Sequence, residues 1–199
     1  MSELKYPFAE LKRETLETKI QMSISFDPNE KHGLFGKTGI GFFDHMLNSF
    51  AVHSGAQLRL DVTGDLNVDC HHTIEDVGIV LGKLLNVAVS TIGASKRYGC
   101  SFIPMDEALA RCVIDISGRP YLVFDYQPSA PMIGDYDTQM TKEFFRAVSF
   151  NMGATLHMKV EYGENDHHCV EALFKAFAHS LKDAMTPIDG ALLSAKGVL

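Results

Sequence analysis

Asp69-Cys70-His71-His72-Thr73-Ile74-Glu75 and Asp166-His167-His168-Cys169-Val170-Glu171 repeat one pattern, a His-His pair followed by Glu. In each copy the first His and the Glu are four residues apart, so on a helix they share one face. The second His points about 100° away around the helix and would reach a different ion. A tag remnant, a surface pair or core histidines could explain one such pair. Two copies in matching frames favour metal ligation, so we predict two metal sites that share ligands from both copies.

The pattern belongs to a longer internal repeat. Residues 44–50 match residues 142–148, and residues 55–60 match residues 153–158, ahead of the two His pairs. A period near one hundred residues is too long for a solenoid unit, so it indicates a duplicated domain. Each half should therefore have the same small fold.

The spacing of apolar residues predicts the elements of each half. They alternate, as in half-buried strands, at Leu16, Ile20, Met22, Ile24 and Phe26, at Leu58, Leu60 and Val62, and at Leu156, Met158, Val160 and Tyr162. They follow helical spacing in residues 42–53, 72–93, 141–152 and 168–185. Two connections are also predicted: a hairpin at residues 27–33, and a break at Gly118-Arg119-Pro120 between strands 108–116 and 121–126.

These elements predict an α+β fold with an internal duplication. We divide the chain into a first half-repeat, residues 1–93, and a second, residues 94–199, which form one compact unit. Each half should be a mostly antiparallel four-stranded sheet with two helices on one face, an arrangement like ribosomal S5 domain 2. The helices of the two halves should pack against each other.

Composition excludes several classes of protein. The 199 residues are 46% hydrophobic, enough for a substantial core, and carry a net charge of -7 with scattered Lys and Arg. Such a chain lacks the basic surface that nucleic acids or acidic lipids require. No run approaches the roughly 18 apolar residues of a membrane span, and the first residues contain no apolar signal segment. We expect a cytoplasmic protein whose four cysteines are reduced thiols rather than metal ligands.

The repeat also nominates further ligands. His45 in the first half aligns with Glu143 in the second, and both lie early on a predicted helix. A pseudo-twofold axis then predicts two metal sites with four protein ligands each, which would leave octahedral positions open for substrate. The sets are His45, His72, His167 and Glu171 for one ion, and His71, Glu75, Glu143 and His168 for the other. The repeat does not decide whether each set closes within one chain or across subunits.

Several motifs in order give the chain a family resemblance. They are residues 39–47 (Gly-Ile-Gly-Phe-Phe-Asp-His-Met-Leu), both His-His-x-x-Glu patterns, residues 104–109 (Pro-Met-Asp-Glu-Ala-Leu), residues 117–120 (Ser-Gly-Arg-Pro) and residues 194–199 (Ser-Ala-Lys-Gly-Val-Leu). From about Arg13 to its last residue the chain resembles the imidazoleglycerol-phosphate dehydratases.

The resemblance implies an activity. It implies a hydro-lyase of histidine biosynthesis that converts D-erythro-imidazoleglycerol phosphate to imidazole acetol phosphate and water. It further implies two Mn²⁺ per active site, and a homo-oligomer of 24 subunits with octahedral symmetry and active sites between subunits. The hydrogen to be removed lies on a carbon without an adjacent carbonyl, so a metal-bound imidazolate would expel the hydroxyl and give a diazafulvene. Zn, Fe, Co and Ni are also compatible with such ligands.

The resemblance also assigns residues. The family's metal positions fall on the same eight residues that the repeat nominates. It makes Glu17 the acid/base, although alone Glu17 would be taken for a solvated strand carboxylate, and it places His45, His71 and Glu171 in the catalytic centre. It assigns substrate and phosphate contacts to His53, Arg97, Arg119, Ser194 and Lys196, in a phosphate-binding tail and its surroundings. Asp106 and Glu107 are equally explained as carboxylates that orient a His or Arg and as a turn into the next strand.

The chain departs from the family pattern at three places. Glu143 stands where many relatives carry His, Cys70 where an acidic residue is common, and residues 193–196 read Leu-Ser-Ala-Lys instead of Pro-Ser-Thr-Lys. The Glu143 change exchanges one ligand for another and puts the metal preference in doubt. Two rival functions stay open: a binuclear hydrolase, which the ligands alone do not exclude, and a metal-storage scaffold, which gives the Arg and Lys residues no role.

Overall fold

A computed structural model describes residues 6–189 of the chain. The first half contains β1 (Phe8–Glu14), β2 (Thr18–Ser25), β3 (Gly33–Phe35), α1 (Gly41–Ser54), β4 (Gln57–Gly64) and α2 (His71–Ile92). The second half contains β5 (Tyr98–Met105), β6 (Ala108–Ile116), β7 (Tyr121–Asp125), β8 (Met132–Ile133), β9 (Tyr136–Asp137), α3 (Met140–Met152), β10 (Ala154–Tyr162) and α4 (Asp166–Ala184).

The two halves have the same sheet topology, which confirms the predicted duplication. Their strand orders are β1-β2-β4-β3 and β5-β6-β10-β7. In each sheet the pairs are antiparallel except the last, where β3 runs parallel to β4 and β7 to β10. The repeat extends to helix ends, because α1 and α3 both stop at a left-handed glycine, Gly55 (φ 77°) and Gly153 (φ 71°), before the next strand.

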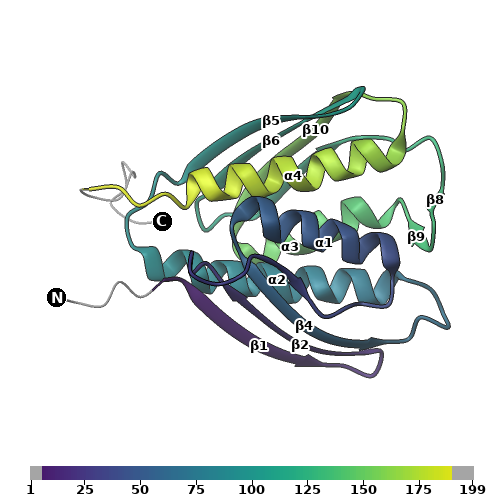
Figure 1. Ribbon diagram of the computed structural model, residues 1–199, viewed down its shortest axis with the longest axis horizontal. Coiled ribbons are helices and arrows are strands. Elements are labelled where there is room, and N and C mark those ends of the chain that lie inside the picture. The colour runs from purple at the N-terminus through teal and green to yellow at the C-terminus, as the bar shows by residue number, and fades with distance from the viewer. Residues whose placement is uncertain (1–5, 190–199) are drawn as a thin grey trace.

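The helices form a layer between the two sheets (Figure 1). The burial pattern of β6 explains this arrangement. Every second residue from Ala108 to Ile116 is buried, so one face of the strand packs against the helices. Within the layer α2 packs against α3, and α1 against α4, so both contacts join the halves. Rings of Phe50 and Phe177 stack at 5.5 Å across one of them. Each such buried ring contributes roughly 1.5–3 kcal/mol through removal of apolar surface from water.

Three details differ from the sequence prediction. Leu16 is fully exposed, because the chain reverses between β1 and β2 through a turn in which Thr15 N donates to Thr18 O at 2.9 Å. Residues 27–33 connect β2 to β3 but form no hairpin, since β4 lies between those strands in the sheet. The small β8–β9 sheet has too few residues to give an apolar period and was not predicted.

Close contact between α2 and α3 leads to a first prediction, at Gly82. A Cβ there would lie 2.7 Å from the Val148 carbonyl oxygen, which is backbone and cannot rotate away. Gly82→Ala should therefore lower the free energy of unfolding by a net amount of about 1–2 kcal/mol, although Ala favours helices. Denaturant titration measures it, with exposed Lys83→Ala as the control, expected to change by less than about 0.5 kcal/mol. A Gly82→Ala midpoint equal to that of the wild type would contradict this packing.

Candidate metal centre

The two His pairs begin helices, as predicted. On α2, the backbone N–H of His71 donates to Asp69 Oδ1 at 2.7 Å. On α4, the N-cap side chain of Asn165 accepts from the backbone N–H groups of His167 and His168. These caps satisfy amides at the helix starts that would otherwise lack a partner, and thereby fix where each pair enters its helix.

The first cluster joins three predicted ligands from three distant stretches of sequence. His45 Nε2 lies 3.3 Å and His167 Nε2 lies 3.4 Å from the same oxygen, Oε2, of Glu171. The other oxygen accepts from Lys175 Nζ at 2.8 Å. Burial raises the pKa of the Glu171 carboxyl, but Lys175 and His45 outweigh it, so the pKa is lowered. A charged carboxylate between two imidazoles is a donor set that fits a divalent transition metal.

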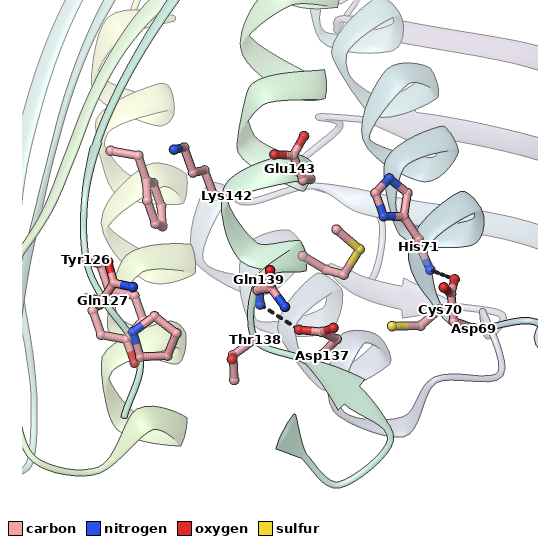
Figure 2. Close-up of a pocket in the computed structure, with 13 residues that line it drawn as sticks. Asp69, Cys70, His71, Tyr126, Gln127, Asp137, Thr138, Gln139, Lys142 and Glu143 are labelled. Atoms are coloured by element: carbon pink, nitrogen blue, oxygen red, sulfur yellow. Dashed lines mark hydrogen bonds between the residues drawn. The ribbon is translucent and has the colours of Figure 1, made fainter. Parts of the chain in front are cut away.

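The second cluster is its counterpart in the repeat and is more open. His71 Nε2 lies 3.9 Å from Glu75 Oε2. Arg146 joins the two carboxylates, at 2.7 Å from Glu143 and 3.4 Å from Glu75. A cleft of about 500 Å³ adjoins this cluster, and Figure 2 shows His71 from α2 and Glu143 from α3 lining it. The guanidinium occupies the place between carboxylates that a cation would favour.

The second His of each pair points outward, as the helical phase predicts. His72 Nδ1 lies 2.9 Å from Asp65, and His72 Nε2 lies 3.7 Å from Glu17. His168 Nδ1 lies 2.7 Å from Glu107, and the hydrogen bond raises the pKa of His168 and lowers that of Glu107 to about 2. Within residues 6–189, the group around Glu171 contains only His45 and His167 as further ligands. One chain thus brings together three members of the first predicted set. Of the second set it places His71 near Glu75, and Arg146 joins Glu75 to Glu143.

Carboxylates that hold the outer histidines should matter for metal binding. Glu107→Gln keeps the shape of the side chain but loses the charge that orients His168 through Nδ1. We expect Mn²⁺ affinity at one of the two sites to fall about 10–100-fold, as is usual when such a supporting group is lost. Titration calorimetry on the assembled protein measures this, with the exposed Glu164→Gln as the control. Two unchanged affinities would show that Glu107 is only a turn residue.

Glu17 lies in the β1–β2 turn and not on a strand face. Thr15 Oγ1 accepts from the backbone N–H of Glu17 at 3.2 Å and from that of Thr18 at 2.9 Å. Thr18 in turn donates to the buried carboxylate of Asp76 on α2, which also pairs with Arg13. The turn that carries Glu17 is therefore tied to the same helix that carries His72.

Arg97 and Arg119, the predicted phosphate contacts in the described range, lie at the opposite end of the helices. Arg97 pairs with Asp115 (Nε to Oδ1, 2.7 Å), and Arg119 Nη2 lies 3.8 Å from the same carboxylate. The Arg97 N–H donates to the Ala184 carbonyl at the end of α4. Because α4 rises about 1.5 Å per residue, Arg97 lies roughly 25 Å from His167. Ser194 and Lys196 lie outside the described residues.

His53 contacts another histidine instead of a ligand cluster. Its Nδ1 lies 3.1 Å from Nε2 of His179. Burial lowers the pKa of His53, and His179 and Lys175 lower it further, against a smaller opposite effect of Glu171. No sequence pattern connects these two residues, which are 126 positions apart.

This shift predicts a pH effect on stability. Between the lowered pKa and the ordinary value of about 6.5, the unfolded chain binds a proton at His53 that the folded chain resists. The contribution of His53 is therefore complete above that range and is lost as the pH falls through it. His53→Gln should lose less stability than the wild type on acidification from about pH 7.5 to about 5.5, and exposed His157→Gln should behave like the wild type. Thermal unfolding at both pH values tests it; equal losses in all three proteins would refute it.

Sequence reasoning missed several residues around the clusters. Lys175 and Arg146 had a local signal, since they follow Glu171 at i+4 and Glu143 at i+3 on helices. Asp65 had none, because it reaches His72 from a loop. All four cysteines are free, and burial raises the pKa of the Cys70 and Cys169 thiols.

The chain is similar to proteins of one known family over most of its length. The sequence profile of the family "Imidazoleglycerol-phosphate dehydratase" matches residues 38–181, a range that contains all eight candidate ligands. The chain belongs to this family. A family member from Acetivibrio thermocellus is 50% identical over 192 residues, which cover 96% of this chain and 97% of that protein.

Two solved structures extend the family relation to the fold. The imidazoleglycerol-phosphate dehydratase of Staphylococcus aureus aligns with a TM-score of 0.82 and 42% identity, over 91% of this chain and 99% of the other. A Pyrococcus furiosus structure aligns with a TM-score of 0.81 and 35% identity, over 95% and 100%. The imidazoleglycerol-phosphate dehydratase family consists of hydro-lyases, so the chain is an enzyme of that class. None of the helices in the described range is long and apolar enough to span a membrane.

Proposed function

We propose that this protein is a metal-dependent dehydratase that converts D-erythro-imidazoleglycerol phosphate to imidazole acetol phosphate and water in histidine biosynthesis. The observation that carries the proposal is the pair of clusters, His45 with His167 and Glu171, and its counterpart around His71. Two donor sets related by the internal repeat suit a substrate whose imidazole ring has two nitrogens. The family relation supplies the identity of that substrate.

The proposed cofactor is two Mn²⁺ per active site. The first cluster would hold one ion through imidazole and carboxylate donors, and His71, Glu75 and Glu143 would hold the other, with Arg146 displaced from its carboxylates. When bound, the ions would supply Lewis-acid polarisation of the ring nitrogens, which favours loss of the hydroxyl and the diazafulvene route. Zn, Fe, Co and Ni are compatible with the same donors.

The chain's own residues would bind the substrate and move its protons. Glu17, with a half-exposed side chain on a fixed turn, would take up and return the proton of the reacting carbon. Arg97 and Arg119 would bind the phosphate, since guanidinium groups match its oxygens in a fork. Asp115 holds the Arg97 fork in place before substrate arrives.

We also propose that the active site is completed by other copies of the chain, in a 24-subunit octahedral assembly. A substrate of this size cannot span the roughly 25 Å that separates Arg97 from His167 along α4. His72 and His168 lie outside their predicted sets and point away from them, so they would complete the clusters of neighbouring subunits. We propose that the enzyme is cytoplasmic, because its four cysteines are free, as expected in a reducing compartment.

The test is a dehydration assay with chelator-stripped protein, before and after addition of Mn²⁺, that follows formation of the keto product. Product that depends on Mn²⁺ is the expected result. Product at the full rate without metal would refute the metal role. No product from an assembled protein with verified metal uptake would refute the dehydratase, and phosphate release from phosphoesters would then identify a binuclear hydrolase.

A further inference from the structure

The turn that carries Glu17 has no apolar contact to hold it. Leu16 is fully exposed and the Glu17 side chain is 53% exposed, so burial of apolar surface fixes neither residue. A short exposed connection of this kind keeps one position only if hydrogen bonds hold its backbone. The placement of Glu17 therefore depends on the polar groups beneath the turn.

A chain of hydrogen bonds runs from this turn to α2. The backbone N–H of Glu17 donates to Thr15 Oγ1 at 3.2 Å, and Thr15 Oγ1 lies 3.2 Å from Thr18 Oγ1. The Thr18 hydroxyl donates to Asp76 Oδ2, since a carboxylate only accepts, so Thr15 is the donor between the two hydroxyls. Such a chain, in which each hydroxyl both accepts and donates, is stronger than its separate bonds.

Asp76 is a buried carboxylate that is held on both of its oxygens. Thr18 donates to Oδ2, and Arg13 Nη2, near the end of β1, donates to Oδ1 at 2.8 Å. Thr18 and Asp76 are both buried. A buried carboxylate paired in this way has one defined orientation, so Asp76 is a fixed anchor for the turn.

The same face of α2 carries His72. His72 and Asp76 are four residues apart, so they lie one above the other on the helix. His72 Nε2 lies 3.7 Å from Glu17 Oε1. One helix face thus holds both the anchor of the turn and the imidazole beside Glu17. Because His72 would complete the cluster of a neighbouring subunit, this connection would bring Glu17 into the same site in a fixed position.

The second half of the repeat lacks this anchor. Ala172 on α4 stands where Asp76 stands on α2. The β5–β6 turn is held instead by Glu107, whose carboxylate accepts from backbone N–H groups in the loop before α4. The common topology of the two halves therefore does not require a carboxylate at this helix position. The Asp76 anchor is specific to the half that carries Glu17.

We propose that Asp76 is a positioning residue of the dehydration, which acts through Thr18 and Thr15 to fix the place of Glu17; this inference rests on the proposed function. A proton is transferred efficiently only over hydrogen-bond distance, so a displacement of about 1 Å at Glu17 can reduce turnover about 10²-fold. Loss of the anchor should therefore reduce kcat and leave the binding of metal and of substrate unchanged.

Substitution of Thr18 tests the anchor at little risk to the fold, because Val is close to Thr in shape and lacks only the hydroxyl. Thr18→Val should lower kcat about 10–10²-fold with KM and Mn²⁺ content unchanged. Thr18→Ser keeps the hydroxyl and should retain a nearly normal kcat. Thr63→Val is the matched control, since Thr63 is exposed on β4 of the same sheet. Asp76→Ala combined with Arg13→Gln removes the anchor without leaving an unpaired buried charge, and its kcat should fall like that of Thr18→Val.

A double-variant comparison separates positioning from a general structural effect. In a Glu17→Gln background, Thr18→Val should cause almost no further loss of kcat, because the anchor acts through the Glu17 carboxylate. An equal loss of kcat in both backgrounds, a normal kcat in Thr18→Val, or a loss explained entirely by missing Mn²⁺ would overturn the proposal.

The same series distinguishes this inference from the proposed function. Metal-dependent dehydration by the wild type, with a normal kcat both in Thr18→Val and in the combined Asp76 and Arg13 variant, would refute the anchor alone. No dehydration by the wild type would refute the function on which the inference rests.

Discussion

Glu171→Gln should remove one of two bound Mn²⁺ ions and reduce turnover by roughly 10³-fold or more, a loss of about 4 kcal/mol of transition-state stabilisation. The reason is geometric: one oxygen of Glu171 faces both His45 and His167. The side chain is only 9% exposed, so water cannot replace the lost charge. A neutral amide at that point would offer the ion a weaker donor and leave the Lys175 ammonium without its carboxylate.

Metal analysis of the assembled variant, together with the dehydration assay, measures the effect. Glu164→Gln is the control, because it makes the same substitution at an exposed position in the loop before α4. Circular dichroism shows whether the unpaired Lys175 unfolds the variant. A folded Glu171→Gln protein with two ions and normal turnover would exclude Glu171 as a ligand.

Glu17→Gln should have a different signature: metal content unchanged and kcat reduced about 10²–10⁴-fold, the usual range for a lost acid/base. Glu17 lies in neither ligand cluster, and its turn is held by Thr15, Thr18 and Asp76 through bonds that do not use the Glu17 side chain. The substitution should therefore leave the turn in place and remove only the proton transfer.

The measurement is kcat and KM with fully loaded protein. The control is Glu14→Gln, an exposed carboxylate at the end of β1 that pairs with Lys19. A loss of bound metal in Glu17→Gln, or a normal kcat, would contradict the acid/base role. Similar losses in Glu14→Gln would indicate a general effect of charge in this region.

Periodicity predicted the long elements well and the short ones poorly. The four helices and the strands that alternate strictly, such as β6, were found within a few residues of their predicted ends. Leu16 was wrongly assigned to a buried strand face because its spacing continued the alternation, while the hydroxyl of Thr15 turns the chain at that point. The β8–β9 pair contains two residues per strand, too few to give any period.

Sequence alone determined the duplication, the two helix starts and the eight candidate ligands. These features depend on interactions within four residues or on repetition along the chain, so they can be found without tertiary structure. The grouping of these ligands into sites also depends on how the helices pack. A helical phase gives the direction of a side chain around its own axis but not which helix lies opposite.

Tertiary structure decided which ligands meet. His45 reaches Glu171 across 126 residues because α1 packs on α4 through buried rings such as Phe50 and Phe177. Helical phase turns His72 and His168 outward, and the fold then brings the Asp65 and Glu107 carboxylates from loops within hydrogen-bond reach of them. Burial of apolar helix faces between two sheets fixes these positions, and burial is a property of the whole fold rather than of any stretch of sequence.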